Sequence, residues 1–423
     1  MELYETKQQE TTALLVGVDL GESDTEESMA ELRELARTAG AQVAGVMVQK
    51  RPAPDTATCV GSGFLEEIGE FCRANDVSLI IFDRELSPIQ MRNIEDATDI
   101  RTIDRTMLIL DIFAGRARSS EGKLQVELAQ LRYMLPRLTG KGIAMSRLGG
   151  GIGTRGPGET KLETDRRHIR GKIDNLKEKL AEVAGQRSRY RERRRRDGIV
   201  TVAIVGYTNA GKSTLLNTLT HAGVLSEDML FATLDPTARA LTLPSGGNVM
   251  LVDTVGFIRR LPHHLIEAFK STLEEAVEAD LILNVCDGSS PIFRDHLRIT
   301  GELLAELGAA EKPVLTVINK IDAADPDNLL GVEGVRISAR TGKGLDALLT
   351  AIEQALPVRK VRVKLCFPFA DIGRSTVVRE NGTVFAEEYT ADGLELDCLI
   401  DTVTAQRLKE FVMRNSECGM RNL

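Results

Sequence analysis

Apolar residues along the first 118 positions follow two alternating periods. Short runs rich in Val, Ile and Leu predict buried strands, and they occupy residues 13–20, 42–48 and 77–82. Elsewhere apolar residues recur every third or fourth position, as on one face of a helix, over residues 28–39, 64–75 and 88–97. Alternating strands and helices are typical of a parallel sheet covered by helices. We therefore expect a small α/β domain at residues 1–118.

Two helical patterns flank a glycine-rich segment within residues 119–197. The stripe before the segment consists of Leu124, Leu128, Leu131 and Leu135, and a thinner stripe after it consists of Ile173, Leu176, Leu180 and Val183. Six of the fourteen residues at 148–161 are glycine, so this loop should not hold one shape by itself. A disordered linker is the alternative, but linkers rarely carry helical stripes on both sides. We expect an antiparallel helical hairpin with loop 148–161 at its tip.

Residues 198–357 return to alternating strands and helices, and residues 358–423 form a shorter tail. Strand-like runs in the longer part lie at 199–205, 248–252, 281–286, 314–318 and 334–337, with an amphipathic helix at 293–307. The tail has strand-like runs at 361–367, 384–389 and 394–400, followed by a helical pattern at 402–413. The whole pattern predicts a multidomain α/β protein that ends in a small α+β domain.

Composition is ordinary for a soluble globular protein. The chain is 42% hydrophobic and 27% charged, and no apolar run approaches the ~18 residues that cross a bilayer. The first residues are polar and acidic, unlike a signal peptide, and the six cysteines are scattered. A net charge of -8 argues against nucleic-acid binding driven by whole-protein charge. An aromatic content of 4% gives no sign of a surface on which bases could stack. We expect a monomeric protein of the cytoplasm.

Positive charge gathers on the helix after the glycine-rich loop. Its basic residues are Arg166, Arg167, Arg170, Lys172, Lys177, Lys179, Arg187, Arg189, Arg191 and residues 193–196. Such a run is often only a solvated helix face. In an acidic protein, and beside a glycine-rich basic loop, contact with a nucleic-acid phosphate backbone is the better interpretation. Because few aromatic residues lie nearby, the contact would recognise shape and charge rather than base sequence.

Candidate chemistry begins where the run 199–205 ends, at residues 206–214 (GYTNAGKST). Glycines let the backbone approach a phosphate closely, and N–H groups at a helix N-terminus attract anions. Lys212 can reach the β- and γ-phosphates, and the Ser213 hydroxyl can bind Mg²⁺. A structural glycine turn is the alternative. The strand before the loop and the helix after it favour a phosphate-binding P-loop.

Two downstream segments fit the same phosphate site. Thr233, in the polar loop 231–237, can complete the Mg²⁺ shell and sense the γ-phosphate. Asp253, at a strand end, can hold the ion through water, and Gly256 can offer its N–H to the γ-phosphate. We assign catalysis to Lys212, Thr233 and Gly256, and the Mg²⁺ ligands to Ser213 and Thr233.

The segment Asn319-Lys320-Ile321-Asp322 predicts selection of guanine. The Asp322 carboxylate can accept two hydrogen bonds from guanine N1 and N2, a donor pair that adenine lacks, so adenine leaves polar groups unpaired. Ser338-Ala339-Arg340 is placed to contact the base edge through backbone N–H groups. The order of these motifs favours GTP over ATP. The predicted GTP-binding residues are Gly206, Tyr207, Thr208, Asn209, Ala210, Gly211, Lys212, Ser213, Thr214, Phe231, Ala232, Thr233, Leu234, Asp235, Asp253, Thr254, Val255, Gly256, Asn319, Lys320, Ile321, Asp322, Ser338, Ala339 and Arg340.

This set of motifs resembles the HflX family of ribosome-associated GTPases, in the Obg-like branch of P-loop GTPases. The likeness rests on residues 206–214, 230–237, 253–257 and 319–322, and residues 158–167 (GETKLETDRR) look like that family's signature loop. The resemblance implies an N-terminal α/β subdomain, a two-helix subdomain, a GTPase domain and a small C-terminal domain. It also implies binding to the large ribosomal subunit and separation of stalled or idle ribosomes into subunits, particularly under stress. We place the implied rRNA contacts at Gly149, Gly150, Gly151, Arg155, Gly156, Gly158, Lys161, Arg166 and Arg167.

Two positions bear on the rate of hydrolysis. Phe257 stands where Ras-like enzymes carry the glutamine that orients the attacking water, and a phenyl ring cannot form that hydrogen bond. We therefore expect slow intrinsic hydrolysis that the large ribosomal subunit stimulates. Asn209 sits where related GTPases use an asparagine to help bind K⁺, so we expect K⁺ to stimulate turnover. The alternative is that asparagine is simply well tolerated in such a loop.

Two other functions stay open. A GTPase of ribosome assembly or rRNA maturation would have the same fold and would bind immature particles rather than assembled ribosomes. A nucleotide-gated adaptor at a membrane surface would instead bring the basic helix onto anionic lipid. The weak amphipathicity of that helix and its lack of aromatic anchors count against the adaptor.

Overall fold

The computed structural model of the chain describes residues 11–21, 25–138, 161–196, 199–220, 230–231, 237–244, 247–259, 274–356 and 360–413. It divides into two compact units. The first consists of residues 1–186, 227–235 and 258–271, and the second of residues 187–226, 236–257 and 272–423.

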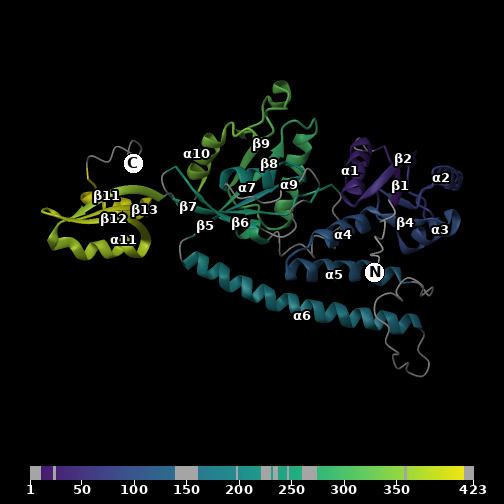
Figure 1. The fold of residues 1–423 in the computed structure, drawn as a ribbon, viewed down its shortest axis with the longest axis horizontal. Coiled ribbons are helices and arrows are strands. Elements are labelled where there is room, and N and C mark those ends of the chain that lie inside the picture. Colours follow the sequence, from purple (N-terminus) through teal and green to yellow (C-terminus); the bar gives the residue numbers. More distant parts are fainter. Residues whose placement is uncertain are drawn as a thin grey trace, which may run out of the picture. The chain divides into compact units, whose positions relative to one another are not determined.

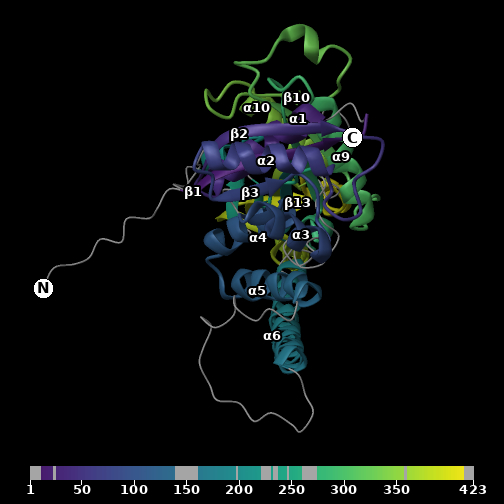
Figure 2. The ribbon, with the colours of Figure 1, turned by 90° about the vertical axis from the view of Figure 1, so that its right-hand side faces the viewer.

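The first unit contains a parallel four-stranded sheet in the order β2-β1-β3-β4. Its strands are β1 (Thr11–Asp19), β2 (Ala41–Lys50), β3 (Leu79–Phe82) and β4 (Arg101–Asp104). Its helices are α1 (Thr25–Thr38), α2 (Ser62–Ala74), α3 (Pro88–Thr98) and α4 (Arg105–Arg116). The predicted α/β arrangement is confirmed, and Figure 2 looks onto it.

Side chains alternate across this sheet and define its two covered faces. Leu14, Val16 and Phe82 pack with residues of α2 and α3, whereas Gly17 lies against Met29 of α1 on the other face. The pattern of apolar positions did not predict β4 and α4. β4 is only four residues long (RTID), and α4 follows it without a loop because the Asp104 side chain caps the helix by accepting a hydrogen bond from Met107 N at 2.9 Å.

The predicted helical pair is α5 (Ser120–Met134), followed by the short 3₁₀ turn η1 (Leu135–Arg137), and α6 (Lys161–Arg196). The two lie side by side in Figure 1. The apolar stripes meet as expected: Leu128 packs with Ile169, Ile173 and Leu176, and further leucines flank this seam. Next to the glycine-rich loop, Arg166 Nη2 donates to Leu138 O at 3.2 Å. Residues 139–160 lie outside the described residues, and with them the predicted loop 148–161 except for Lys161, which begins α6.

The second unit contains a six-stranded sheet in the order β10-β9-β8-β5-β7-β6, parallel except for the β6–β7 pair. Its strands are β5 (Val200–Gly206), β6 (Thr237–Thr242), β7 (Asn248–Asp253), β8 (Leu281–Asp287), β9 (Val314–Asn319) and β10 (Val335–Arg336). Its helices include α7 (Lys212–Thr220), α9 (Phe293–Glu306), the 3₁₀ turn η2 (Pro326–Leu329) and α10 (Leu345–Ala355). Residues 274–278 are also helical.

The two faces of this sheet are both buried, which explains the nearly continuous apolar runs of its central strands. Ile204 and Leu283 pack with Leu215 of α7 on one face, and Ala203 and Ile282 pack with α9 residues on the other. The sequence did not predict β6, because only Leu241 of this edge strand is buried.

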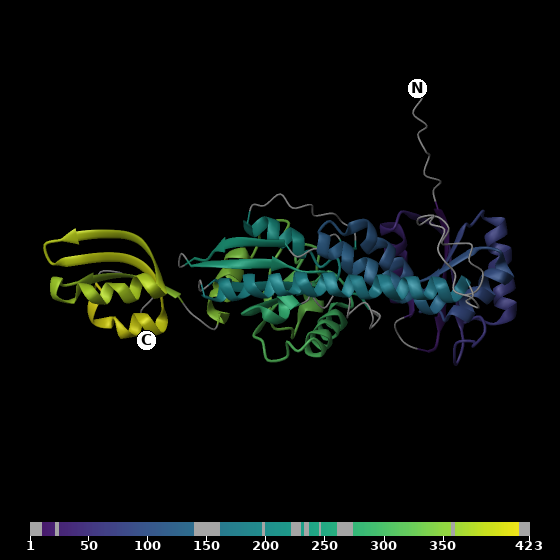
Figure 3. The same cartoon turned by 90° about the horizontal axis from the view of Figure 1, so that it is seen from below.

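The second unit also holds a three-stranded antiparallel sheet in the order β11-β13-β12. Its elements are β11 (Lys360–Phe367), η3 (Phe369–Arg374), α11 (Ser375–Asn381), β12 (Gly382–Thr390), β13 (Gly393–Asp401), α12 (Thr402–Arg407) and η4 (Lys409–Phe411). Figure 3 shows its strands on one side and its helices on the other.

The helix expected over residues 402–413 is interrupted in this part of the chain. α12 ends at Arg407, and the 3₁₀ turn η4 follows it. This turn places Phe411 in the core, where its ring centroid lies 4.8 Å from that of Phe367. Helix α11 was not predicted. No helix in the described ranges is long and apolar enough to cross a membrane.

Candidate nucleotide site

The glycine-rich loop after β5 requires glycine at both ends. Gly206 has φ +146°, and a Cβ there would lie 2.0 Å from Val285 O. Gly211 has φ +89°, and a Cβ there would lie 2.3 Å from Asn319 Nδ2. A side chain at either position would therefore displace the loop. The loop leads directly into α7, so the predicted strand–loop–helix context is confirmed.

Lys212, the first residue of α7, points its ammonium back into the loop. Nζ donates to Gly206 O at 3.1 Å and to Tyr207 O at 2.8 Å, and the side chain is buried. Burial lowers the pKa of Lys212 to about 8, although the nearby Asp253 carboxylate acts in the opposite direction. A phosphate anion at this position would favour the charged ammonium.

Two oxygen-bearing side chains that could bind a metal ion lie next to each other near Lys212. The Ser213 hydroxyl lies 2.7 Å from Asp253 Oδ2, and Asp253 is completely buried at the end of β7. Hydroxyl and carboxylate oxygens are the ligands that Mg²⁺ prefers, so the pair fits this ion. Thr233, the second predicted ligand, lies outside the described residues together with Ala232, Leu234 and Asp235.

The segment after β7 is tied to the phosphate loop by its backbone. Phe257 N donates to Gly206 O at 3.0 Å, and Thr208 N donates to Phe257 O at 2.7 Å. Between these bonds, Gly256 lies so close to the loop that a Cβ would stand 2.8 Å from Thr208 Cγ2 and 2.9 Å from Lys212 Nζ. Gly256 therefore lies in close contact with Thr208 and Lys212. The neighbouring Thr254 instead donates its hydroxyl to Ile204 O at 2.8 Å.

The Phe257 ring is buried in the hydrophobic core. The side chain is 2% exposed and packs with Tyr207, Ala276 and Ala279. The sequence alone indicated that a phenyl ring cannot orient water. The structure adds that the ring belongs to the hydrophobic core.

Residues 319–322, which are predicted to select the base, contact the glycine-rich loop through Asn319. Its Nδ2 donates to Ala210 O at 2.9 Å, and its Oδ1 accepts from Ala339 N at 2.9 Å. Asn319 therefore fixes the spacing between the two loops. The Asp322 carboxylate is held by the Ser338 hydroxyl and by the Arg340 guanidinium, and these contacts lower the pKa of Asp322. Lys320 pairs with Asp287 at 2.7 Å.

Some contacts within the first unit involve Phe231 and Arg259, which lie in or next to the predicted segments 231–237 and 253–257. The ring of Phe231 is buried and meets that of Phe113 on α4 at 4.6 Å, edge to face. Arg105 Nη2 donates to Arg259 O at 3.2 Å, and the Arg259 guanidinium pairs with Glu27 at 3.2 Å. Phe231 was predicted from the sequence to bind the nucleotide, and no role was predicted for Arg105 or Arg259. The only signal for Arg259 was its position just after residues 253–257.

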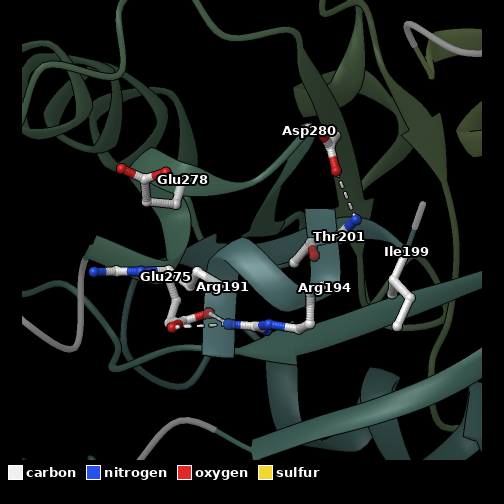
Figure 4. A pocket seen from close by; sticks show the side chains of 7 residues that line it. All are labelled: Arg191, Arg194, Ile199, Thr201, Glu275, Glu278 and Asp280. Carbon is white, nitrogen blue, oxygen red and sulfur yellow. Dashed lines mark hydrogen bonds and ion pairs between the residues drawn. The ribbon is translucent and has the colours of Figure 1, made fainter. Parts of the chain in front are cut away.

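The last turns of α6 make ion pairs inside the second unit. Arg187 and Arg191 reach Glu274 at 3.6 and 3.3 Å, and Arg194 reaches Glu275 at 3.3 Å. Figure 4 shows Arg194 directed at Glu275 in a small pocket, beside the hydrogen bond from Thr201 N to Asp280. These three arginines, expected to face nucleic acid, are engaged by carboxylates of the same protein.

The predicted rRNA-binding residues are only partly described. Arg167 is exposed, and the half-buried Arg166 bonds to Leu138 O. Lys161 begins α6. Arg155 and the five predicted loop glycines, Gly149, Gly150, Gly151, Gly156 and Gly158, lie outside the described residues.

Comparison with known proteins gives matches along most of the chain. Family models described as "GTP-binding GTPase N-terminal", "GTP-binding GTPase Middle Region" and "50S ribosome-binding GTPase" match residues 26–114, 116–194 and 201–320. A protein of Caldanaerobacter subterraneus subsp. tengcongensis named GTPase HflX is 50% identical over 401 residues, covering 95% of this chain and 94% of the relative. GTPase HflX of Escherichia coli K12 is 44% identical, covering 81% and 82%. A solved GTP-binding protein of Sulfolobus solfataricus in complex with GDP is 26% identical, with TM-score 0.43, covering 82% and 98%.

Proposed function

This chain belongs to the HflX family of GTPases, and we propose that it uses GTP to bind the large ribosomal subunit and to separate assembled ribosomes into subunits. As a GTPase it converts GTP and water to GDP and phosphate. The GTP-bound form would hold the large subunit, and hydrolysis would release the factor.

The observation that carries this proposal is the combination, in one chain, of the GTP motifs with a long helical arm. The arm consists of the packed helices α5 and α6, and the glycine-rich residues 139–160 join them. A model described as "50S ribosome-binding GTPase" matches residues 201–320, and a middle-region model matches the arm. Exposed Arg167, Arg170 and Lys179 on α6 supply positive charge that can meet rRNA phosphates.

At the nucleotide, we propose that Lys212 and Gly256 contact the terminal phosphates and that Ser213 and Thr233 bind Mg²⁺. The Mg²⁺ ion would neutralise phosphate charge during transfer. Asp322 would select guanine, and K⁺ would bind beside Asn209. Because the Phe257 ring is buried, intrinsic hydrolysis would be slow until the ribosome completes the site.

Sedimentation of assembled ribosomes in sucrose gradients tests the proposal directly. We expect the protein with GTP, or with a non-hydrolysable analogue, to convert ribosomes into free subunits, and the protein with GDP to leave them intact. If ribosomes stay intact in every case and the protein migrates only with large subunits or their precursors, ribosome assembly becomes the better function. Salt-sensitive pelleting with anionic liposomes, in place of ribosomes, would instead support the membrane adaptor.

A further inference from the structure

The Thr208 hydroxyl is a buried polar group inside the phosphate loop. The residue is 7% exposed, and its Oγ1 has no hydrogen-bond partner in the described part of the chain. Leaving a buried hydroxyl without a partner is unfavourable, because the group loses its hydrogen bonds to water and gains none in the protein. Buried polar groups without a hydrogen bond are rare in proteins, and one physical reason for such a group is that a bound ligand supplies the missing bond.

The neighbours of Thr208 indicate which part of a nucleotide it would meet. A Cβ on Gly256 would lie 2.8 Å from the methyl carbon Cγ2 of Thr208 and 2.9 Å from Lys212 Nζ, so the side chains of Thr208 and Lys212 both lie against Gly256. The Thr208 hydroxyl is carried by the same Cβ as this methyl, and rotation about the Cα–Cβ bond exchanges their positions. Lys212 and Gly256 are the groups that we assign to the terminal phosphates. The bond from Thr208 N to Phe257 O at 2.7 Å fixes Thr208 against the segment that carries Gly256.

The same segment lacks the side chain that usually helps hydrolysis. Ras-like enzymes place a polar group directly after this glycine, whereas the Phe257 ring is 2% exposed in the core. A polar group that assists the transferred phosphoryl must therefore come from another position. Thr208 is such a group, and the fold already places it beside Lys212 and Gly256.

We propose that Thr208 is a catalytic residue whose Oγ1–H donates a hydrogen bond to an oxygen of the γ-phosphoryl group. The oxygen of water forms the new bond to phosphorus, the bond from phosphorus to the β–γ bridging oxygen breaks, and GDP leaves with that electron pair. A proton from water ends on the released phosphate. Thr208 keeps its own proton and forms no covalent bond. The inference rests on the proposed assignment of the nucleotide site to residues 206–214.

Because GDP has no γ-phosphate, the proposal separates hydrolysis from GDP binding. Thr208→Val keeps the shape of the side chain and removes the hydroxyl, whereas Thr208→Ser keeps the hydroxyl. In the full chain we expect Thr208→Val to lower kcat for GTP about 10-fold or more, as for other lost transition-state donors. We expect its Kd for GDP to stay at the wild-type value, and Thr208→Ser to retain most of the turnover.

Two control variants make the outcomes distinct. Thr350→Val removes an exposed hydroxyl on α10 that bonds only within its helix, to Asp346 O at 2.9 Å, and should leave kcat unchanged. Lys212→Ala should abolish binding of both GTP and GDP. If Lys212→Ala still binds GDP, the assignment of the nucleotide site fails. If that control behaves as expected but Thr208→Val turns over at the wild-type rate, or Thr208→Ser is as slow as Thr208→Val, the role of the hydroxyl is refuted.

Discussion

At the residue scale, Asn209 has two candidate roles: its side chain binds K⁺, or asparagine serves only to permit the loop conformation. A single variant distinguishes these two roles. Its φ is +59°, a conformation that asparagine tolerates better than most residues and glycine tolerates freely. Asn209→Gly therefore keeps the loop and removes the side-chain oxygen that could bind K⁺. If that oxygen binds K⁺, wild-type turnover is faster in K⁺ than in Na⁺, and Asn209→Gly has the same slow rate in both. If asparagine serves only the backbone, wild type and variant respond alike to the two cations.

At the element scale, the arginines at the end of α6 can either contact nucleic acid or form a clamp, by which we mean ion pairs with carboxylates of the same protein. Arg187, Arg191 and Arg194 are 18–25% exposed, and their carboxylate partners are 12–35% exposed. Partly exposed pairs of this kind contribute roughly 0.5–1 kcal/mol each, so Glu274→Ala should lower the stability by about 1 kcal/mol. A shift of thermal unfolding to lower temperature measures this loss.

The salt dependence of binding to the large subunit separates the two roles of α6. Each lost phosphate contact reduces the slope of log K against log salt by about 0.7–0.9. If the arginines form a clamp, replacing all three by alanine leaves this slope unchanged. The matched variant replaces Arg170, Lys172 and Lys179, which are exposed along the same helix, and should reduce the slope. A reduced slope for the clamp variant would restore the original interpretation of the basic run.

At the scale of the whole molecule, GTP hydrolysis and ribosome splitting should depend on different parts of the chain. The helices α5 and α6 pack through Leu128, Ile169, Ile173 and Leu176, none of which belongs to the glycine-rich loop. Replacing residues 149–158 by a short Gly-Ser linker should therefore leave the hairpin and intrinsic GTP hydrolysis intact. Sucrose gradients should show that this variant no longer separates subunits. A variant that still splits ribosomes would exclude the loop as the working part.

Features that depend only on neighbouring residues could be predicted from the sequence. Strand, glycine turn and helix follow one another within residues 199–220, and the stripes of α5 and α6 are visible in the helical period. Such features are local, because a glycine at a tight turn or a leucine on a helix face needs no distant partner to be recognised. The order of the motifs at residues 206–214, 253–256 and 319–322 then predicted a site for GTP rather than ATP.

The distant partners of individual residues, by contrast, became clear from the fold. It put the Phe257 ring in the core, Phe231 against Phe113, and Arg105 on the backbone of Arg259, a contact across 154 positions of sequence. It also showed that three basic residues of α6 form ion pairs with Glu274 and Glu275. The physical reason is that a charge or an aromatic ring carries no local mark of its partner. Solvent, nucleic acid and a distant carboxylate all suit an arginine equally well until the fold brings one of them within reach.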